Sequence, residues 1–126
     1  MTKLLNKSIE LAKSIHNPHL QEYNVYAFIY NKNRLLAIGH NDMLNDNNKA
    51  LYFGNRFNIE QFKKFPKKHA EIDAISKLWG KRTIDGSETL ITIRLKKDYS
   101  VGNAKPCNNC MVVIDALGIT KLEWTK

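Results

Sequence analysis

The chain has 126 residues, of which 43% are hydrophobic and 25% are charged, and its formal net charge is +8 at pH 7. These proportions are typical of one globular domain over residues 1–126, and no apolar run approaches the roughly 20 residues of a membrane helix. Sixteen lysines and four arginines carry the positive charge. Phosphate-binding surfaces of nucleic-acid-binding proteins favour the bidentate fork of arginine, so an excess of lysine is weak evidence for a nucleic-acid partner. The positive charge fits an anionic ligand without identifying one.

Periodicity in the first half of the chain predicts a helix and a hairpin. Apolar residues recur at near-helical spacing over residues 4–15, which favours an amphipathic helix. Residues 25–30 and 35–39 are rich in β-branched and aromatic side chains on either side of a turn-like segment, and this pattern is typical of two paired strands. Residues 41–66 show no clear period, so we expect a long functional loop there, with one short helix at most.

The second half of the chain alternates helices and strands. We expect a helix to begin near His69 and stop at Gly80, and another to begin near Cys107. The apolar runs at 89–94 and 122–124 predict two further strands. The order α-β-β-α-β-α-β predicts an α/β fold, a three-layer α/β/α sandwich with a mixed four-stranded sheet.

Two short motifs carry more chemical information than the rest of the chain. They are His69-Ala70-Glu71 and, much later, Pro106-Cys107-Asn108-Asn109-Cys110. One histidine and two cysteines hold a zinc ion through three positions and leave the fourth open for water, as in catalytic zinc sites. The joint pattern H-x-E … P-C-x-x-C is also the signature of hydrolytic base deaminases.

Both motifs fall at predicted helix starts, where unpaired N–H groups and the helix dipole favour the thiolate forms of Cys107 and Cys110. Pro106 suits the entry to such a turn, and the i, i+3 spacing turns both sulfurs toward one ion. His69 would supply the third ligand from the neighbouring helix. Glu71 would not bind the metal but would move protons between the water and the base.

Two other interpretations remain open at this point. A C-x-x-C pair after a strand also occurs in thioredoxin-like redox proteins, although that chemistry needs neither His69 nor Glu71. A structural zinc site would take a fourth ligand, and His16, His19 and His40 are available for it. The coincidence of both motifs at two helix starts favours a catalytic zinc over either alternative.

The chain resembles the cytidine deaminase superfamily from about residue 23 to residue 124, and it is similar to the small phage-type members. This superfamily contains cytidine and deoxycytidylate deaminases, tRNA adenosine deaminases and polynucleotide cytidine deaminases. The resemblance rests on residues 35–41, 69–75, 89–94 and 106–119. The second and fourth of these segments contain the specific motifs, and the other two only support them.

The resemblance also implies three substrate contacts. An asparagine shortly after the second strand contacts the sugar in this family, and Asn41 has that place. The backbone N–H of Ala70 would bind the carbonyl of the base, and the backbone carbonyl of Pro106 would accept a hydrogen bond from its amine. By its position alone, Asn41 is also typical of a turn residue beside Gly39.

The chain departs from the family pattern in two places. The loop over residues 96–105 is longer than in the tRNA enzymes, and its Tyr99, Asn103 and Lys105 are candidates either for substrate contact or for solvated surface. The sequence also ends directly after the fourth predicted strand. We therefore expect an exposed sheet edge, which a homo-oligomer would cover.

The lysine-rich segment 63–68 directly precedes His69 and allows two interpretations. In the first interpretation, the segment lies at the mouth of the pocket, where its lysines would attract phosphate and Phe65 would stack on a base. Alternatively, it is a solvated lysine run with one aromatic residue in the core.

Three functions are consistent with these patterns. The first is zinc-dependent hydrolytic deamination of a cytosine base in a nucleoside or nucleotide, giving the uracil product and ammonia. The second is deamination of cytosine or adenine within single-stranded DNA or RNA, including tRNA adenosine, which the positive charge would suit. The third is a zinc-binding or nucleic-acid-binding module without turnover, and the presence of Glu71 argues against it.

We expect the first function, with Zn²⁺ as cofactor, a nucleoside or nucleotide as partner and no membrane association. A cytoplasmic location follows from two observations. The first ten residues interrupt their apolar positions with Lys, Asn and Glu, unlike a signal peptide. Both cysteines lie in one C-x-x-C, which leaves none for a structural disulfide.

Overall fold

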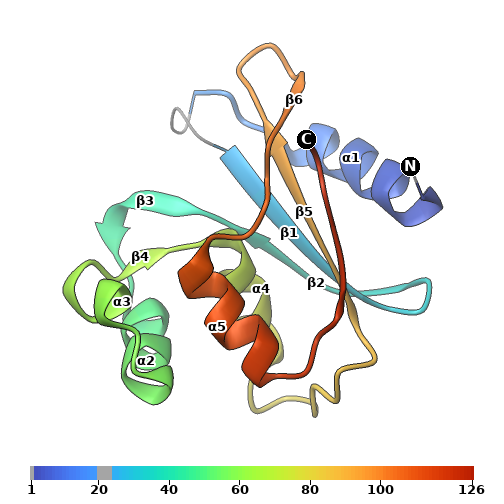
Figure 1. Ribbon diagram of the computed structural model, residues 1–126. Coiled ribbons are helices and arrows are strands. Elements are labelled where there is room, and N and C mark those ends of the chain that lie inside the picture. Colours follow the sequence, from blue (N-terminus) through green and yellow to red (C-terminus); the bar gives the residue numbers. More distant parts are fainter. Residues whose placement is uncertain (1, 20–23) are drawn as a thin grey trace.

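The computed structural model describes residues 2–19 and 24–126, so Tyr23, where the family resemblance begins, lies outside the described residues. A mixed sheet forms the middle layer, with α1 on one face and α4 and α5 on the other (Figure 1). In chain order the elements are α1 (Lys3–Ile15), β1 (Asn24–Asn31), β2 (Arg34–His40), β3 (Asp42–Asp46), α2 (Asn48–Phe57), α3 (Glu60–Lys64), β4 (Lys67–Lys68), α4 (Ala70–Leu78), β5 (Thr89–Leu95), β6 (Val101–Gly102), α5 (Asn108–Ala116) and β7 (Lys121–Trp124). Within the described part of the chain, every helix is too short or too polar to cross a membrane.

The central sheet has five strands, in which β2, β1 and β5 are antiparallel neighbours. The other edge of β5 is shared by two strands: β7 runs parallel to its first half, and β6 runs antiparallel to its last two residues. The predicted α/β/α sandwich is confirmed. The predicted sheet had four strands and the observed sheet has five. The segment between β5 and Cys107 folds back and contributes the additional two-residue strand β6.

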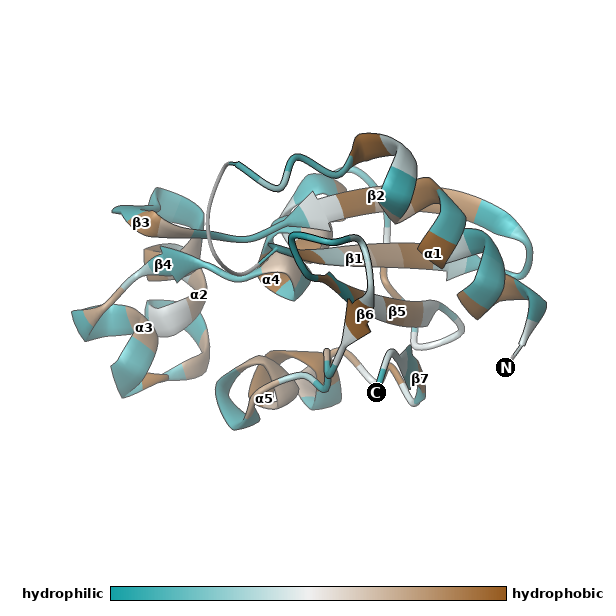
Figure 2. Ribbon diagram, turned by 90° about the horizontal axis from the view of Figure 1, so that it is seen from above, coloured by the Kyte–Doolittle hydropathy of each residue, from teal (hydrophilic) through white to brown (hydrophobic). Residues whose placement is uncertain are grey.

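The two faces of the sheet belong to two separate hydrophobic clusters, because side chains alternate along a strand. On β1, Tyr26 and Phe28 pack with α1, whereas Ala27 and Ile29 pack with α4 and α5. Both faces are therefore buried, and the run 25–30 is almost continuously apolar. Figure 2 shows this as brown ribbon along β1 and β5 between the helical layers.

The segment 41–66 is not the long loop that its irregular pattern suggested. It forms β3, α2 and α3, and β3 pairs with β4 in a small separate ribbon. Asn47 caps α2 by accepting a hydrogen bond from the backbone N–H of Ala50 at 3.0 Å. Inside α2, Gly54 lies so close to Phe62 that a Cβ would be 2.8 Å from the Cβ of that residue. A glycine that would ordinarily weaken a helix thus allows α3 to pack against it.

A second glycine fixes the position of α4 relative to the sheet. A Cβ at Gly39 on β2 would collide with the backbone of Ala70 and Ala74. The missing side chain lets the start of α4 lie directly on β2. The backbone N–H of His40 then donates to the Asp73 carboxylate at 3.0 Å, which ties the end of β2 to the first turns of α4.

Candidate metal centre and active site

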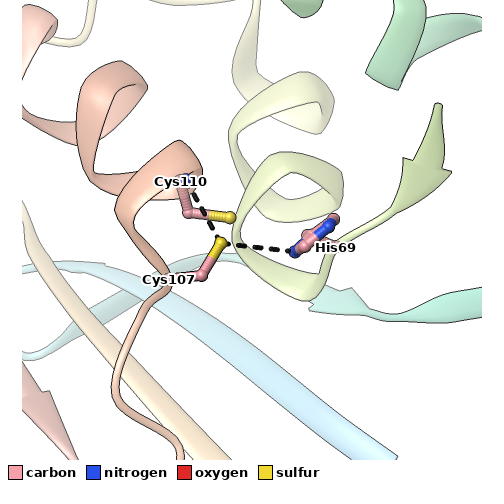
Figure 3. Close-up of side chains that lie close together, drawn as sticks. All are labelled: His69, Cys107 and Cys110. Atoms are coloured by element: carbon pink, nitrogen blue, oxygen red, sulfur yellow. Dashed lines mark hydrogen bonds between the residues drawn. The ribbon is translucent and has the colours of Figure 1, made fainter. Parts of the chain in front are cut away.

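The two sequence motifs meet where α4 and α5 begin (Figure 3). His69 is the N-cap residue of α4, Cys107 is the N-cap residue of α5, and Cys110 lies in the first turn of α5. One nitrogen of the histidine and the two sulfurs all lie within 4.8 Å of one another. The expected helix starts at these residues are therefore observed, and they bring together side chains that are far apart in the sequence.

The spacing of the three side chains fits a zinc ion. Zinc–sulfur and zinc–nitrogen bonds of about 2.3 and 2.0 Å place tetrahedral ligands roughly 3.5–3.8 Å apart. The Cys107 sulfur lies 3.8 Å from Nδ1 of His69, and it accepts the backbone N–H of Cys110 at 3.5 Å. One nitrogen and two sulfurs are also the donor types that zinc prefers.

The cluster contains three ligands within the described residues, and none of the remaining histidines joins it. His16 lies at the end of α1, where its ring nitrogens meet the Tyr26 hydroxyl at 2.8 Å and the Lys96 carbonyl at 3.0 Å. The Nε2 atom of His40 lies 3.1 Å from the Asn24 side chain. The alternative of a structural zinc with a fourth histidine ligand therefore has no support in the geometry.

The protonation of the cluster suits metal binding. A hydrogen bond from the Cys110 thiol, helped by His69 and opposed by burial, lowers the pKa of Cys107 to about 4. The same hydrogen bond and burial raise the pKa of Cys110. Burial lowers the pKa of His69, but the hydrogen bond to Cys107 and the nearby negative charges outweigh it, so the net shift is upward. The lowered pKa favours the thiolate form of Cys107, which is the form that binds metal.

Glu71 lies in the first turn of α4 and is 5% exposed. Burial raises the pKa of its carboxyl above the ordinary value, and the Cys110 thiol is its hydrogen-bonding neighbour. A carboxyl group with a raised pKa, held beside a metal cluster, can both accept and return a proton near neutral pH.

A cavity of about 330 Å³ opens onto this cluster. Its walls come from one end each of β1 and β5, from Asn41 and β3, from the start of α4 and from the segment that leads into α5. The lining residues are Val25, Asn41, Met43, His69, Ala70, Glu71, Arg94, Asn103, Ala104, Lys105 and Cys107. Of the residues suggested by the family resemblance, Asn41 and Ala70 line the cavity. Pro106 is buried directly before Cys107 but is not among the lining residues.

Asn41 lies between β2 and β3 and is 5% exposed. Its side-chain oxygen accepts the backbone N–H of Val25 at 3.0 Å, and its own N–H donates to the Val25 carbonyl at 3.3 Å. The residue therefore both shapes the cavity wall and holds it against β1.

The segment 96–105 contributes only part of what the sequence suggested. Asn103 and Lys105 line the cavity. Tyr99 instead packs edge-on against the ring of His16, 4.7 Å between centroids, on the α1 side of the sheet. The lysine-rich segment 63–68 does not line the cavity either, and its Lys67 pairs with Asp46 at 2.8 Å.

Arg94, Met43 and Val25 line the cavity but were not expected from the sequence. For Arg94 a signal was present. Arg94 lies four residues after Leu90 on β5, and side chains an even number of residues apart on a strand point to the same face. Leu90 packs with α4 and α5, so Arg94 lies on that face too. An arginine in that register places a charge on the face of β5 that packs with α4 and α5, and such a charge marks a candidate site.

An α/β/α sandwich with a histidine and two cysteines at adjoining helix starts, and a buried glutamate beside them, is the arrangement expected for a zinc-dependent base deaminase. The family model described as cytidine and deoxycytidylate deaminase zinc-binding region matches residues 1–126, and the chain belongs to this family. Membership supports a hydrolytic enzyme, and together with the His69, Cys107 and Cys110 cluster it supports Zn²⁺ as the cofactor.

The fold is also similar to a solved structure, the apo form of dCMP deaminase from the cyanophage S-TIM5. The TM-score is 0.56 and the sequence identity is 21%, and the match covers 100% of this chain and 88% of the phage protein. At this identity the likeness concerns the fold. None of the curated proteins matches the chain.

Proposed function

We propose that the protein is a zinc-dependent hydrolase that deaminates the cytosine base of a nucleoside or nucleotide, giving the uracil product and ammonia. The observation that carries this proposal is the burial of Glu71 beside the His69, Cys107 and Cys110 cluster, at a cavity of small-molecule size. The three cluster residues would hold the zinc ion. When bound, zinc supplies the Lewis-acid activation that makes water a nucleophile near neutral pH.

Glu71 is the proton carrier in this proposal. It accepts one proton from the attacking water and delivers it to the ring nitrogen N3, so that the C4–O bond forms on an activated base. It then carries the second proton of that water to the departing amine, and the C4–N bond breaks with release of ammonia. The raised pKa of Glu71 suits both halves of this cycle, because it makes the carboxylate a stronger proton acceptor and keeps the protonated form to higher pH.

The proposed contacts to the base and the sugar come from the cavity wall and from the entry to α5. The backbone N–H of Ala70 is one of the first-turn groups of α4 that have no partner within the helix, so it suits the base carbonyl. We assign the amine contact to the backbone carbonyl of Pro106 and the sugar contact to Asn41, which lines the cavity.

A second candidate is deamination within single-stranded DNA or RNA, and the net charge of +8 favours it. The shape of the site favours a monomeric substrate instead. A volume of about 330 Å³ lies at the lower end of the roughly 300–1,000 Å³ found for small-molecule sites. The lysine-rich segment 63–68, which would attract a polymer, does not contribute to the lining.

The test is the substitution Glu71→Gln in the zinc-loaded protein. We expect zinc content to stay the same and deamination to fall by roughly 100- to 10,000-fold, the usual contribution of general acid–base catalysis. Mass spectrometry would follow cytidine, its mono- and triphosphates, adenosine and a mixed oligonucleotide.

Glu10→Gln is the matched control for this test, because Glu10 is exposed on α1 and the charge change is identical. This control should keep the wild-type rate. Full activity of the Glu71→Gln protein would refute the proton-carrier role. Turnover only in the oligonucleotide would establish the second candidate instead.

A further inference from the structure

Two cations line the wall of the cavity outside the metal cluster. Apart from the cluster residues and Glu71, the charged residues that line it within the described part of the chain are Arg94 and Lys105. The chemistry at a neutral cytosine ring requires neither of them. Their common property is positive charge, so the cavity is suited to a substrate that carries an anion next to the base.

The position of Arg94 is built into the sheet. The residue faces Gly102 across the β5–β6 ladder and Val25 across the β5–β1 ladder. A Cβ at position 102 would be 3.1 Å from Cδ and 3.4 Å from Nε of Arg94, so the glycine leaves room for the arginine side chain. The backbone N–H of Arg94 donates to the Thr125 hydroxyl at 3.1 Å, which fixes the strand at this point.

A second set of hydrogen bonds holds the segment that carries Lys105. Its backbone N–H donates to the side-chain oxygen of Asn103 at 2.9 Å, which closes a tight turn. Next to it, the Ala104 carbonyl accepts the Thr92 hydroxyl at 2.7 Å, and the Ala104 N–H donates to the Thr125 carbonyl at 2.9 Å. The segment that carries Lys105 is therefore anchored to the sheet although the lysine itself is exposed.

An arginine and a lysine that line the same cavity are typical of phosphate recognition. Arginine binds two phosphate oxygens at once through its planar fork, and lysine adds a point charge. A terminal phosphate monoester carries close to two negative charges at neutral pH, which matches two cations better than the single charge of a phosphodiester.

We propose that Arg94 and Lys105 bind the 5′-phosphate of the substrate, so that the enzyme acts on a cytosine nucleoside monophosphate and discriminates against the free nucleoside. This inference rests on the deaminase function proposed above. It assigns a role to the segment 96–105, because residues 103–105 line the cavity and Gly102 leaves room for the Arg94 side chain.

The experiment compares the zinc-loaded wild type with Arg94→Gln, Lys105→Met and the control Arg82→Gln. Arg82 is exposed after α4, and its substitution removes the same charge. The measured quantity is the ratio of kcat/KM for deoxycytidine 5′-monophosphate to kcat/KM for deoxycytidine. A lost charged hydrogen bond corresponds to a fall in this ratio of roughly 10- to 100-fold.

We expect that fall in Arg94→Gln, a smaller one in Lys105→Met, and the wild-type ratio in Arg82→Gln. Arg94→Lys should recover part of the ratio, because it restores the charge without the fork. Lys105→Met also covers the case in which the Arg94 variants do not fold, since the lysine is exposed. Equal ratios in Arg94→Gln and Arg82→Gln would overturn the inference, and so would preferential deamination of an oligonucleotide.

A binding measurement separates this inference from the deaminase proposal. Zinc-loaded Glu71→Gln protein is titrated calorimetrically with the monophosphate and with the nucleoside, with and without Arg94→Gln. Tighter binding of the monophosphate that disappears in the double variant supports the phosphate site even if no turnover is found. Equal affinity for both ligands overturns it. Absence of turnover in the wild type on all substrates would overturn the deaminase function alone.

Discussion

Helices α1 and α2 begin in a different way from helices α4 and α5. Thr2 and Asn47 each accept a backbone N–H through a side-chain oxygen, at 3.1 and 3.0 Å, as N-cap residues usually do. His69 makes no such bond at the start of α4, and Cys107 offers only a sulfur, 3.5 Å from its partner, at the start of α5. Sulfur is a weak acceptor.

At the starts of α4 and α5, residues of the His69, Cys107 and Cys110 cluster occupy the cap positions in place of an oxygen cap. A good oxygen cap stabilises a helix by about 0.5–2 kcal/mol, and these two helices forgo it. Packing compensates, because Ile72 and Ile75 on α4 and Val113 and Ile114 on α5 are fully buried. Helices α1 and α2 thus follow the ordinary capping rule, whereas α4 and α5 depart from it beside the proposed active site.

The substitution Cys107→Ala should have the largest effect on the helix starts that carry the metal cluster. We expect zinc affinity to fall by more than about 100-fold, because even residues that only support metal ligands contribute 10- to 100-fold. The melting temperature of the zinc-containing protein should fall with it, since metal binding stabilises the folded state. Zinc per chain and competition with a chelator would measure the effect.

Asn108→Ala is the control for the Cys107 variant, because Asn108 is exposed in the same turn of α5 and lies outside the cluster. It should keep its zinc. An unchanged zinc content in Cys107→Ala would remove this residue from the ligand set.

The pH dependence of the zinc-free protein gives a smaller effect. The pKa of Glu71 is raised in the folded state above its ordinary value of 4.5, mainly by burial. Its contribution to stability is therefore complete below pH 4.5 and is lost as the pH rises through the folded-state value, with a slope of at most about 1.4 kcal/mol per pH unit. Denaturant unfolding after chelation should show that Glu71→Gln becomes relatively more stable across this window. A pH-independent difference between the two proteins would contradict the shift.

The smallest expected effect concerns the ordinary oxygen cap of α2. Asn47→Ala removes the cap of α2 and should lower the free energy of unfolding by about 1 kcal/mol. Zinc content and deamination should stay at the wild-type level, because the residue lies outside the metal cluster and the cavity lining. Chemical denaturation together with a zinc assay would check both statements, and zinc loss in this variant would show that the two kinds of helix start are coupled.

Alternation and helical periodicity were sufficient to predict the main elements. The strands around Phe28 and Ile91 are buried on both faces, so their apolar runs are long and unambiguous. The motif residues His69 and Cys107 were also placed correctly at helix starts. These signals are local, since they need only the order of side chains within about ten residues.

The parts that escaped prediction depend on contacts between distant residues. Helix α2 contains Gly54, which reads as a helix breaker until its contact with Phe62 is known. Strand β6 is two residues long and is held partly by the Thr125 hydroxyl, which accepts the Arg94 N–H and donates to the Gly102 carbonyl at 2.6 Å. Alternation along β5 indicates the face on which Arg94 lies, but the cavity that it lines is formed by segments far apart in the sequence and did not follow from local pattern.

The contact between Gly39 and the backbone of Ala70 has a consequence for how the protein tolerates change. Position 39 lies on β2 and outside the cavity lining, so it would attract no notice in a search for reactive groups. Any larger residue there would push the histidine-bearing end of α4 off the sheet. In a survey of all single substitutions, replacing Gly39 should reduce activity as much as replacing a residue of the metal cluster or Glu71. The reason is lack of space for a side chain, since Gly39 takes no part in the proposed chemistry.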